Sequence, residues 1–441
     1  MRWSLLSQPA TQRIVAALTV EGAPVRFVGG CVRDTLLQRQ FRDIDLATPD
    51  QPERVQLLLE KAGIRTVPLG HGTVTAIVEG GETFEITSLR RDIVCNGRHA
   101  VIAYTDDWIE DAARRDFTIN ALSTDTDGTI YDPFSGLSDL YCGHVRFVGS
   151  PRDRIAEDVL RLLRYFRFHS LYGRSSPHDA ALAACRELAP RLASLSGERV
   201  RDELWKILLS PNPASILLLM RESGVLQYVL HEASHFKRLR VLAWLEEQRC
   251  FHIEGIVSDP LRRLAAVLTV GGATAEAVAT RLRLPHSESR RLRSLLEEVP
   301  TALTPAPGMT ERALRKTLQT LGTARVRDLT MLQWAASLSA IGNTAVADNM
   351  LWLRLLRTTT QWTNIPFPLR GKDALALGLE PGPQVGMLLR ALRQWWEETG
   401  YQANRVVLLA KLEECIRKHV MVKRKVHDAT GTGDSYCPDN W

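Results

Sequence analysis

The sequence has few cysteines and no long apolar runs, and both absences narrow the possible classes of protein. The seven cysteines include no Cys-x-x-Cys pair, and an odd number argues against a disulfide framework or a structural zinc site. We therefore expect a protein of a reducing compartment, the cytoplasm. No apolar run approaches the roughly 18 to 20 residues that a membrane helix needs, so no membrane partner is expected. The first residues lack a charged-then-apolar signal pattern, and 8–19 are expected to form a short helix.

Charge of neither sign dominates the sequence. Lys and Arg number 56 against 50 Asp and Glu, and the net charge of +6 permits nucleic-acid binding without arguing for it. A composition of 45% hydrophobic and 24% charged residues excludes collagen, a disordered tail and a coiled-coil rod. At about 150 residues per domain, the 441 residues suggest two to four domains. None of the 11 histidines stands in a metal-binding pattern such as His-Glu-x-x-His.

The first 150 residues differ in pattern from the remainder. Short β-branched segments bounded by glycines predict strands over 25–28, 73–78 and 83–87, with helices over 31–38 and 51–62. From about residue 151, apolar residues recur at helical spacing. The helices expected there cover 154–171, 178–189, 199–209, 213–222, 236–248 and, after interruptions at 301–308 and 364–383, 384–419. The sequence thus predicts an α+β protein with a mixed α/β N-terminal part, an all-α remainder and a disordered segment, 426–441.

A glycine pair, an arginine and an aspartate pair follow one another within about 20 residues. After a predicted strand, Gly29 and Gly30 let the backbone approach a ligand, and the following helix directs N–H groups outward. Arg33, one turn later, adds a cation for phosphate. Asp43 and Asp45 share a strand face, and such paired charges favour a shared cation, here Mg²⁺. A glycine turn or an aspartate pair alone would be an ordinary turn or a solvated edge.

Three features of the sequence each allow two interpretations. Glu85 could be a third carboxylate of this site or a solvent-facing residue of an amphipathic strand. The polar loop 90–100 could be a functional element of the phosphate and metal site or a simple surface loop. The basic clusters 281–293 and 417–425 could meet RNA phosphates or be solvated helix faces.

These residues resemble the signature of class II tRNA CCA-adding enzymes and bacterial poly(A) polymerases. The match begins with Gly29-Gly-Cys-Val-Arg-Asp34 and Asp43-Ile-Asp45. It continues through an Arg-Arg-Asp motif, an Asp-Pro-Phe segment, a Glu-Asp-x-x-Arg helix and looser stretches, at 111–121, 130–140, 157–161, 195–200, 367–371 and 394–401. The resemblance covers about 8–419.

The resemblance implies template-independent addition of CCA to the 3′ end of tRNA from CTP and ATP. The tRNA 3′-hydroxyl would attack the α-phosphate and release pyrophosphate, with Mg²⁺ as cofactor. By the same resemblance, the metal ligands and catalytic residues would be Asp43 and Asp45. The nucleotide would be bound by Gly30, Arg33, Arg115, Asp158, Arg161, Arg164 and Arg167.

The family architecture implies a head, neck, body and tail. The corresponding boundaries are 1–150 for the catalytic nucleotidyltransferase head, 151–210 for the base-recognising neck, 211–300 for the body and 301–425 for the tail. The tail would bind tRNA, with contacts to the acceptor arm and elbow. The oligomeric state stays open.

Base choice without a template follows from one predicted helix, 155–168. Asp158 and Arg161, three residues apart, would share its face. A carboxylate accepts from the exocyclic amine of cytosine or adenine, whereas uracil and guanine place a carbonyl oxygen there. In a pocket that excludes water, that carbonyl oxygen has no donor and is repelled by the carboxylate, which disfavours uracil and guanine. The alternative is an ordinary ion pair on a solvated helix.

Other activities remain open from the sequence. A poly(A) polymerase would carry a Gly-Arg-Arg-Phe type element where this chain has Leu69-Gly-His-Gly-Thr73. An enzyme that adds only CC or only A differs by subtle loop changes. A non-catalytic RNA-binding protein would not need Asp43, Asp45 and Arg115.

Overall fold

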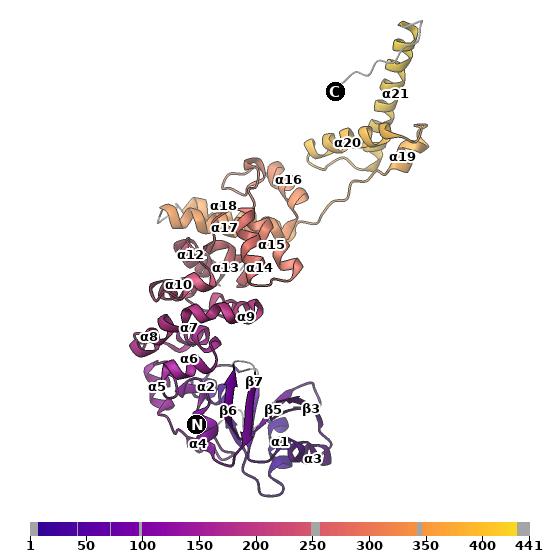
Figure 1. Cartoon of the computed structure of the whole chain (residues 1–441). Helices are drawn as coiled ribbons and strands as arrows, with labels where there is room; N and C mark the ends of the chain where they lie inside the picture. The colour runs from indigo at the N-terminus through magenta and orange to yellow at the C-terminus, as the bar shows by residue number, and fades with distance from the viewer. Residues whose placement is uncertain are drawn as a thin grey trace. The chain divides into compact units, whose positions relative to one another are not determined.

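The computed structural model describes residues 8–41, 43–70, 72–96, 99–247, 256–341 and 346–429. Contacts divide the chain into two units. The first comprises Met1–Glu247 and Val257–Glu297, and the second comprises Gln248–Ile256 and Glu298–Trp441. The strands lie in the N-terminal part of the chain, and helices make up the rest (Figure 1).

A seven-stranded mixed sheet forms the centre of the N-terminal part, with strand order β3-β4-β5-β2-β1-β8-β9. The strands are β1 Arg26–Val28, β2 Ile44–Thr48, β3 Arg65–Gly70, β4 Thr73–Ile77, β5 Thr83–Ser88, β8 Ser123–Thr124 and β9 Ile130–Tyr131. The paired strands β2 and β5 run parallel, and the other neighbouring pairs run antiparallel. Ile44 and Leu46 are buried on β2, so Asp45 between them projects from the opposite face.

Helices pack on this sheet as the apolar spacing predicts. Helix α1 (Pro9–Thr19) packs against α3 (Pro52–Lys61), which covers β3, β4 and β5. Helix α2 (Gly30–Leu36) contacts β1 and β2. Three further elements complete this part: α4 Trp108–Ala113, the 3₁₀ turn η1 Thr118–Asn120 and α5 Gly136–Cys142.

The prediction of a polar loop over 90–100 is wrong, because the described residues of this segment belong to strands. It is part of an antiparallel pair of strands, β6 (Arg90–Asn96) and β7 (His99–Tyr104). The β-branched residues within it favour strands more than its polar flanks favour a loop.

The helix expected over 155–168 is interrupted. The structure has α6 (Pro151–Glu157) and α7 (Leu160–Tyr172), and Asp158 between them is extended, with φ −144° and ψ 108°. The Asp158 Oδ1 accepts a hydrogen bond from the Leu160 N–H at 3.1 Å. Aspartate competes for backbone donors in this way and so favours helix ends over helix interiors.

The rest of the first unit is helical. Its elements are α8 Asp179–Leu188, the 3₁₀ segment η2 Ala189–Ser194, α9 Gly197–Leu208, α10 Pro213–Glu222, α11 Leu226–Val229, α12 Phe236–Glu247, α13 Pro260–Val267, α14 Gly272–Arg281 and α15 His286–Leu296. Their core includes a buried ion pair, in which Arg263 Nε donates to Glu246 Oε2 at 2.6 Å.

The second unit is also helical. Its elements are η4 Thr301–Leu303, α16 Glu311–Leu321, α17 Thr323–Ile341, α18 Val346–Gln361, α19 Gly371–Ala376, α20 Pro383–Glu398 and α21 Arg405–Ala429. The single helix expected over 384–419 is wrong, because the chain turns between α20 and α21. Gly400 and Tyr401 adopt positive φ there, and the Tyr401 ring packs edge-on against Trp396 at 4.9 Å.

Two further predictions concern the C-terminal segment 426–441 and the lack of a membrane-spanning helix. Of the segment predicted to be disordered, 426–429 ends α21, and 430–441 lie outside the described residues. Among the described helices, none is both long enough and apolar enough to cross a bilayer.

Candidate active site

The glycine turn before α2 brings the predicted phosphate and metal residues together. Gly29 has φ 70° and ψ −123°, a conformation that disfavours a side chain. A Cβ at Gly29 would lie 3.0 Å from the Arg115 Nη1 and 4.0 Å from the Asp45 Oδ2. Arg115 therefore reaches the turn from a segment far along the chain, and a side chain at position 29 would force its guanidinium to move.

Three carboxylates lie at one end of two parallel strands. Asp43 precedes β2, and strand pairing places Asp45 opposite Glu85 of β5. Burial, together with the negative charges of Glu85 and Asp43, raises the pKa of Asp45 to about 6 against the opposing effect of Arg115 and Arg33. Such crowded negative charge is what a bound cation relieves.

The donor set fits a metal bound jointly by protein and substrate. No group of three or more His, Cys, Asp or Glu suited to holding one ion occurs among the described residues. Mg²⁺ is commonly held by one or two carboxylates with phosphates and water as its other ligands. Asp43 and Asp45 supply such a pair, while the exposed Glu85 stays a candidate third donor.

Arg33 is buried beside the glycine turn. Its Nε and Nη2 donate to the Asp34 carboxylate at 3.0 and 2.7 Å, and its Nη1 donates to the Asn120 Oδ1. The Nη2 would lie 3.7 Å from a Cβ at Gly30, so one edge of the guanidinium faces the turn. Sequence reasoning missed the role of Asp34 and Asn120, although both belong to the motifs noted above.

Arg115 is oriented by a buried carboxylate of α4. Its Nη2 donates to the Asp111 Oδ2 at 3.0 Å, and Arg114 donates to the Asp111 Oδ1 at 2.8 Å. Burial alone would raise the pKa of Asp111, but Arg115 and Arg114 outweigh it and hold that pKa below its usual range. Asp111 is therefore ionised at neutral pH and fixes Arg115 beside the turn.

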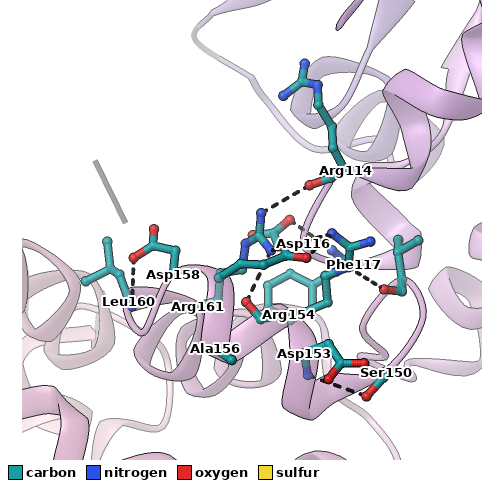
Figure 2. A network of polar contacts seen from close by, with 12 residues as sticks. Arg114, Asp116, Phe117, Ser150, Asp153, Arg154, Ala156, Asp158, Leu160 and Arg161 are labelled. Carbon is teal, nitrogen blue, oxygen red and sulfur yellow. Dashed lines mark hydrogen bonds and ion pairs between the residues drawn. The ribbon is translucent and has the colours of Figure 1, made fainter. Parts of the chain in front are cut away.

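The break between α6 and α7 separates the two predicted base-reading residues. Figure 2 shows Arg161 extending from α7 toward the backbone oxygen of Arg114, to which its Nη2 donates at 3.1 Å. Arg161 Nη1 also donates to the Glu157 carboxylate at 2.5 Å. Asp158 instead accepts from the Arg199 Nη2 of α9 at 2.9 Å. The expected pairing of the Asp158 and Arg161 side chains on one helix face is thus replaced by two other ion pairs, although the Arg161 N–H still donates to the Asp158 backbone oxygen at 3.0 Å.

The remaining predicted arginines of α7 surround one aromatic ring. The Phe168 centroid lies 5.4 Å from the Arg164 guanidinium, 4.7 Å from that of Arg167 and 5.3 Å from that of Arg33. Arg164 Nε donates to the Asp116 Oδ2 at 2.6 Å, and Arg167 Nη1 donates to the buried Glu203 at 2.9 Å. The structure therefore brings together Arg33, Arg164 and Arg167, three of the residues that the resemblance assigns to the nucleotide, around Phe168, a ring that sequence reasoning did not single out.

Asp116 is expected to stabilise the folded protein in a pH-dependent way. Burial alone would raise its pKa, but Arg164 and a hydrogen bond from Asn120 outweigh burial and hold the pKa of Asp116 below its usual range. A depressed folded-state pKa contributes stability above the unfolded value, about 4, and loses it as the pH falls through the folded pKa. Asp116→Asn should lower the free energy of unfolding by about 2 kcal/mol at pH 7 and by progressively less below pH 4.

Urea unfolding at pH 7 and pH 3.5 measures this difference. The control is Asp106→Asn, which changes an exposed aspartate of the same unit and should leave the unfolding free energy nearly unchanged at both pH values. An equal loss of stability at the two pH values in Asp116→Asn would contradict the assignment.

Two family models match the chain. The model described as "Poly A polymerase head domain" matches residues 25–146, which hold the sheet, the glycine turn and Arg115. The model described as "Probable RNA and SrmB- binding site of polymerase A" matches residues 176–237, from α8 to the start of α12.

Relatives with assigned activities match most of the chain. The mouse protein named CCA tRNA nucleotidyltransferase 1, mitochondrial, is 33% identical over 407 residues, 89% of this chain and 87% of its own length. The CCA-adding enzyme of Levilactobacillus brevis is 31% identical over 398 residues, 87% of this chain and 91% of its own.

Solved structures share the fold. The CCA-adding enzyme of Bacillus stearothermophilus, solved in complex with CTP, has a TM-score of 0.73 and 27% identity, with 94% of this chain and 99% of that one covered. The Thermotoga maritima CCA-adding enzyme, solved with tRNA, has a TM-score of 0.61 at 19% identity over 93% of this chain, and supports the fold alone. These neighbours confirm the predicted α+β fold class, and the mouse and Levilactobacillus brevis relatives confirm the family resemblance.

Proposed function

The chain belongs to the family of CCA-adding tRNA nucleotidyltransferases, and from this we propose that it adds C, C and A to the 3′ end of tRNA. CTP and ATP are the nucleotide substrates, and tRNA is the macromolecular partner. The activity for which its relatives are named agrees with the one expected from the sequence. The observation that carries the proposal is the meeting of Asp45, Arg115 and the glycine turn in one site.

The reaction needs no protein nucleophile. The tRNA 3′-hydroxyl attacks the nucleotide α-phosphate, a bond to the phosphorus forms, and pyrophosphate leaves. Asp43 and Asp45 would hold the divalent metal, for which we propose Mg²⁺, and the chemistry supplied by such a metal would be a lower pKa of the hydroxyl and partial neutralisation of the phosphate charge. Glycine at position 30 allows the triphosphate to approach the backbone, while Arg33 and Arg115 neutralise its charge.

Base recognition falls to the α6–α7 break. We assign to Asp158 the acceptor for the exocyclic amine of cytosine or adenine, and to Arg161 a donor to a ring acceptor. Arg199 and Glu157 hold these two side chains and so set their orientation. Arg164 and Arg167 would complete the positively charged side of the nucleotide pocket, between the base and the phosphates.

The tRNA would contact the helical part of the chain. We keep the division into a head at 1–150, a neck at 151–210, a body at 211–300 and a tail at 301–425. In the basic cluster 281–293, four of the arginines already pair with carboxylates, namely Arg281, Arg283, Arg291 and Arg293. That pairing reduces the charge available to phosphates. Of the second cluster, 417–425, Arg417 and Lys418 pair with Glu413 and Glu414, and the side chains from 419 lie outside the description.

We place the enzyme in the cytoplasm. Four of its cysteines are free thiols in the described part of the chain: Cys31, Cys142, Cys185 and Cys415. Free thiols fit a reducing compartment. Since the mouse relative is named mitochondrial, cell fractionation with both compartments as outcomes is the test.

Three tRNA transcripts distinguish the possible activities. They end at the discriminator base, at C and at CC, and each is incubated with one labelled nucleotide at a time. CCA addition predicts incorporation of C into the first two transcripts and of a single A into the third, then a stop. Addition of C alone or of A alone indicates a partial enzyme, long A tracts indicate a poly(A) polymerase, and no incorporation indicates a non-catalytic protein.

A further inference from the structure

The last residue of α7, Tyr172, contacts the phosphate-binding part of the head. Its hydroxyl donates to the Asp34 Oδ1 at 2.8 Å, and the Arg33 guanidinium lies 4.3 Å from the centre of its ring. Arg39 lies 5.0 Å from the same ring and donates through Nη1 to the backbone oxygen of Leu171 at 3.0 Å. Tyr172 is therefore fixed against the segment that follows the glycine turn.

Asp34 transmits this contact to Arg33. The Asp34 Oδ1 accepts from both the Tyr172 hydroxyl and the Arg33 Nε, while the Oδ2 accepts from the Arg33 Nη2. Burial raises the pKa of Tyr172 to about 12, so the hydroxyl keeps its proton and acts as the donor at neutral pH. A charge-assisted hydrogen bond of this kind restricts the rotation of the carboxylate, and hence of the guanidinium that it holds.

A second path leads from Arg33 back to α7. The Arg33 Nη1 donates to Asn120, the Asn120 amide donates to Asp116 at 2.8 Å, and Asp116 accepts from Arg164. Arg164 and Tyr172 are eight residues apart on one helix, about 12 Å at 1.5 Å per residue. The polar contacts thus form a closed circuit that begins and ends on α7, with Arg33 held between the two ends.

We propose that Tyr172 is a positioning residue for the nucleotide triphosphate and acts through Asp34 on Arg33. This rests on the proposed function, in which Arg33 binds the triphosphate. The start of α7 carries Arg161, assigned to the base, and its end sets the phosphate-binding cation. One helix therefore fixes the distance between base and phosphates in the same way for CTP and ATP.

Tyr172→Phe tests the proposal, because it removes the hydroxyl and keeps the ring. Loss of a contact that positions the triphosphate equally before and during reaction should raise the KM for CTP and for ATP by the same factor, roughly fivefold, with kcat changed less than about twofold. Discrimination between CTP and UTP should not change, since the base pocket is untouched.

The matched control is Tyr165→Phe on the same helix. Tyr165 is also buried, and its hydroxyl accepts from the His178 N–H at 3.0 Å, away from the glycine turn. This variant should match the wild type in both KM values. An unchanged KM in Tyr172→Phe, an equal rise in Tyr165→Phe, or altered base discrimination would overturn the proposal.

A double-mutant cycle tests the path through Asp34. If Tyr172 acts through that carboxylate, Tyr172→Phe should have little further effect in an Asp34→Asn background, whereas additive effects would refute the path. Calorimetric CTP affinities of the wild type and the variants give the same comparison without turnover. A wild-type protein that binds CTP but extends no transcript would refute the proposed function, and the CTP affinities would still decide the role of Tyr172.

Discussion

Asp43→Ala will lower the rate of nucleotide transfer by at least roughly 1,000-fold, because a metal at a developing alkoxide and phosphate contributes several kcal/mol to transition-state stabilisation. Binding of tRNA, measured by filter retention, should be nearly unchanged, since the variant removes no lysine or arginine that could contact the tRNA phosphates. The rate is followed as single-turnover addition of C to a transcript ending at the discriminator base.

The melting temperature separates this loss from misfolding. Asp43 crowds Asp45 with like charge, so its removal should leave the melting temperature unchanged or slightly higher. Glu82→Ala, which removes an exposed acid before β5, is the control and should transfer nucleotides at the wild-type rate. Retained activity in Asp43→Ala, or lost tRNA binding, would refute its assignment as a metal ligand.

Asp158→Ala will relax base choice. With the Asp158 carboxylate gone, the carbonyl oxygen of UTP is no longer repelled. In the wild type, that oxygen is an unpaired acceptor, which costs about 1–3 kcal/mol. The ratio of kcat/KM for CTP to that for UTP should therefore fall by roughly 5- to 150-fold. The measurement compares the two nucleotides on a transcript ending at the discriminator base.

Arg199→Ala should relax base choice in the same direction but less, because Asp158 keeps its bond to the Leu160 N–H and loses only the guanidinium. The matched control is Arg152→Ala, which breaks an exposed pair with Glu187 in the same part of the chain. Unchanged discrimination in Asp158→Ala, or equal changes in Arg152→Ala and Arg199→Ala, would contradict the assignment of the base-reading residues.

Two errors in the sequence-based fold, at Asp158 and at Gly400, arose where a side chain or a single backbone conformation interrupted a periodic pattern. The apolar spacing around Asp158 continues without change, yet its carboxylate accepts the Leu160 N–H at the start of the next helix, and its extended backbone interrupts the predicted one. The same holds at Gly400 and Tyr401, where an aromatic contact fixes a turn inside a helical pattern. Periodicity reports which face is buried and does not report where the chain turns.

The sequence by itself determined which residues form the proposed phosphate and metal segment, because Gly29, Gly30, Arg33, Asp43 and Asp45 lie close together along the chain, around the helix α2 and before or on the strand β2. Local geometry relates residues so close in the chain, and their chemistry is legible from spacing alone. Only the tertiary structure decided which partners hold the arginines. Asp158 with Arg199, Arg33 with Asn120 and Tyr172 with Asp34 are separated by 41, 87 and 138 residues. Contacts over such separations depend on how whole helices pack, for which no local pattern carries a signal.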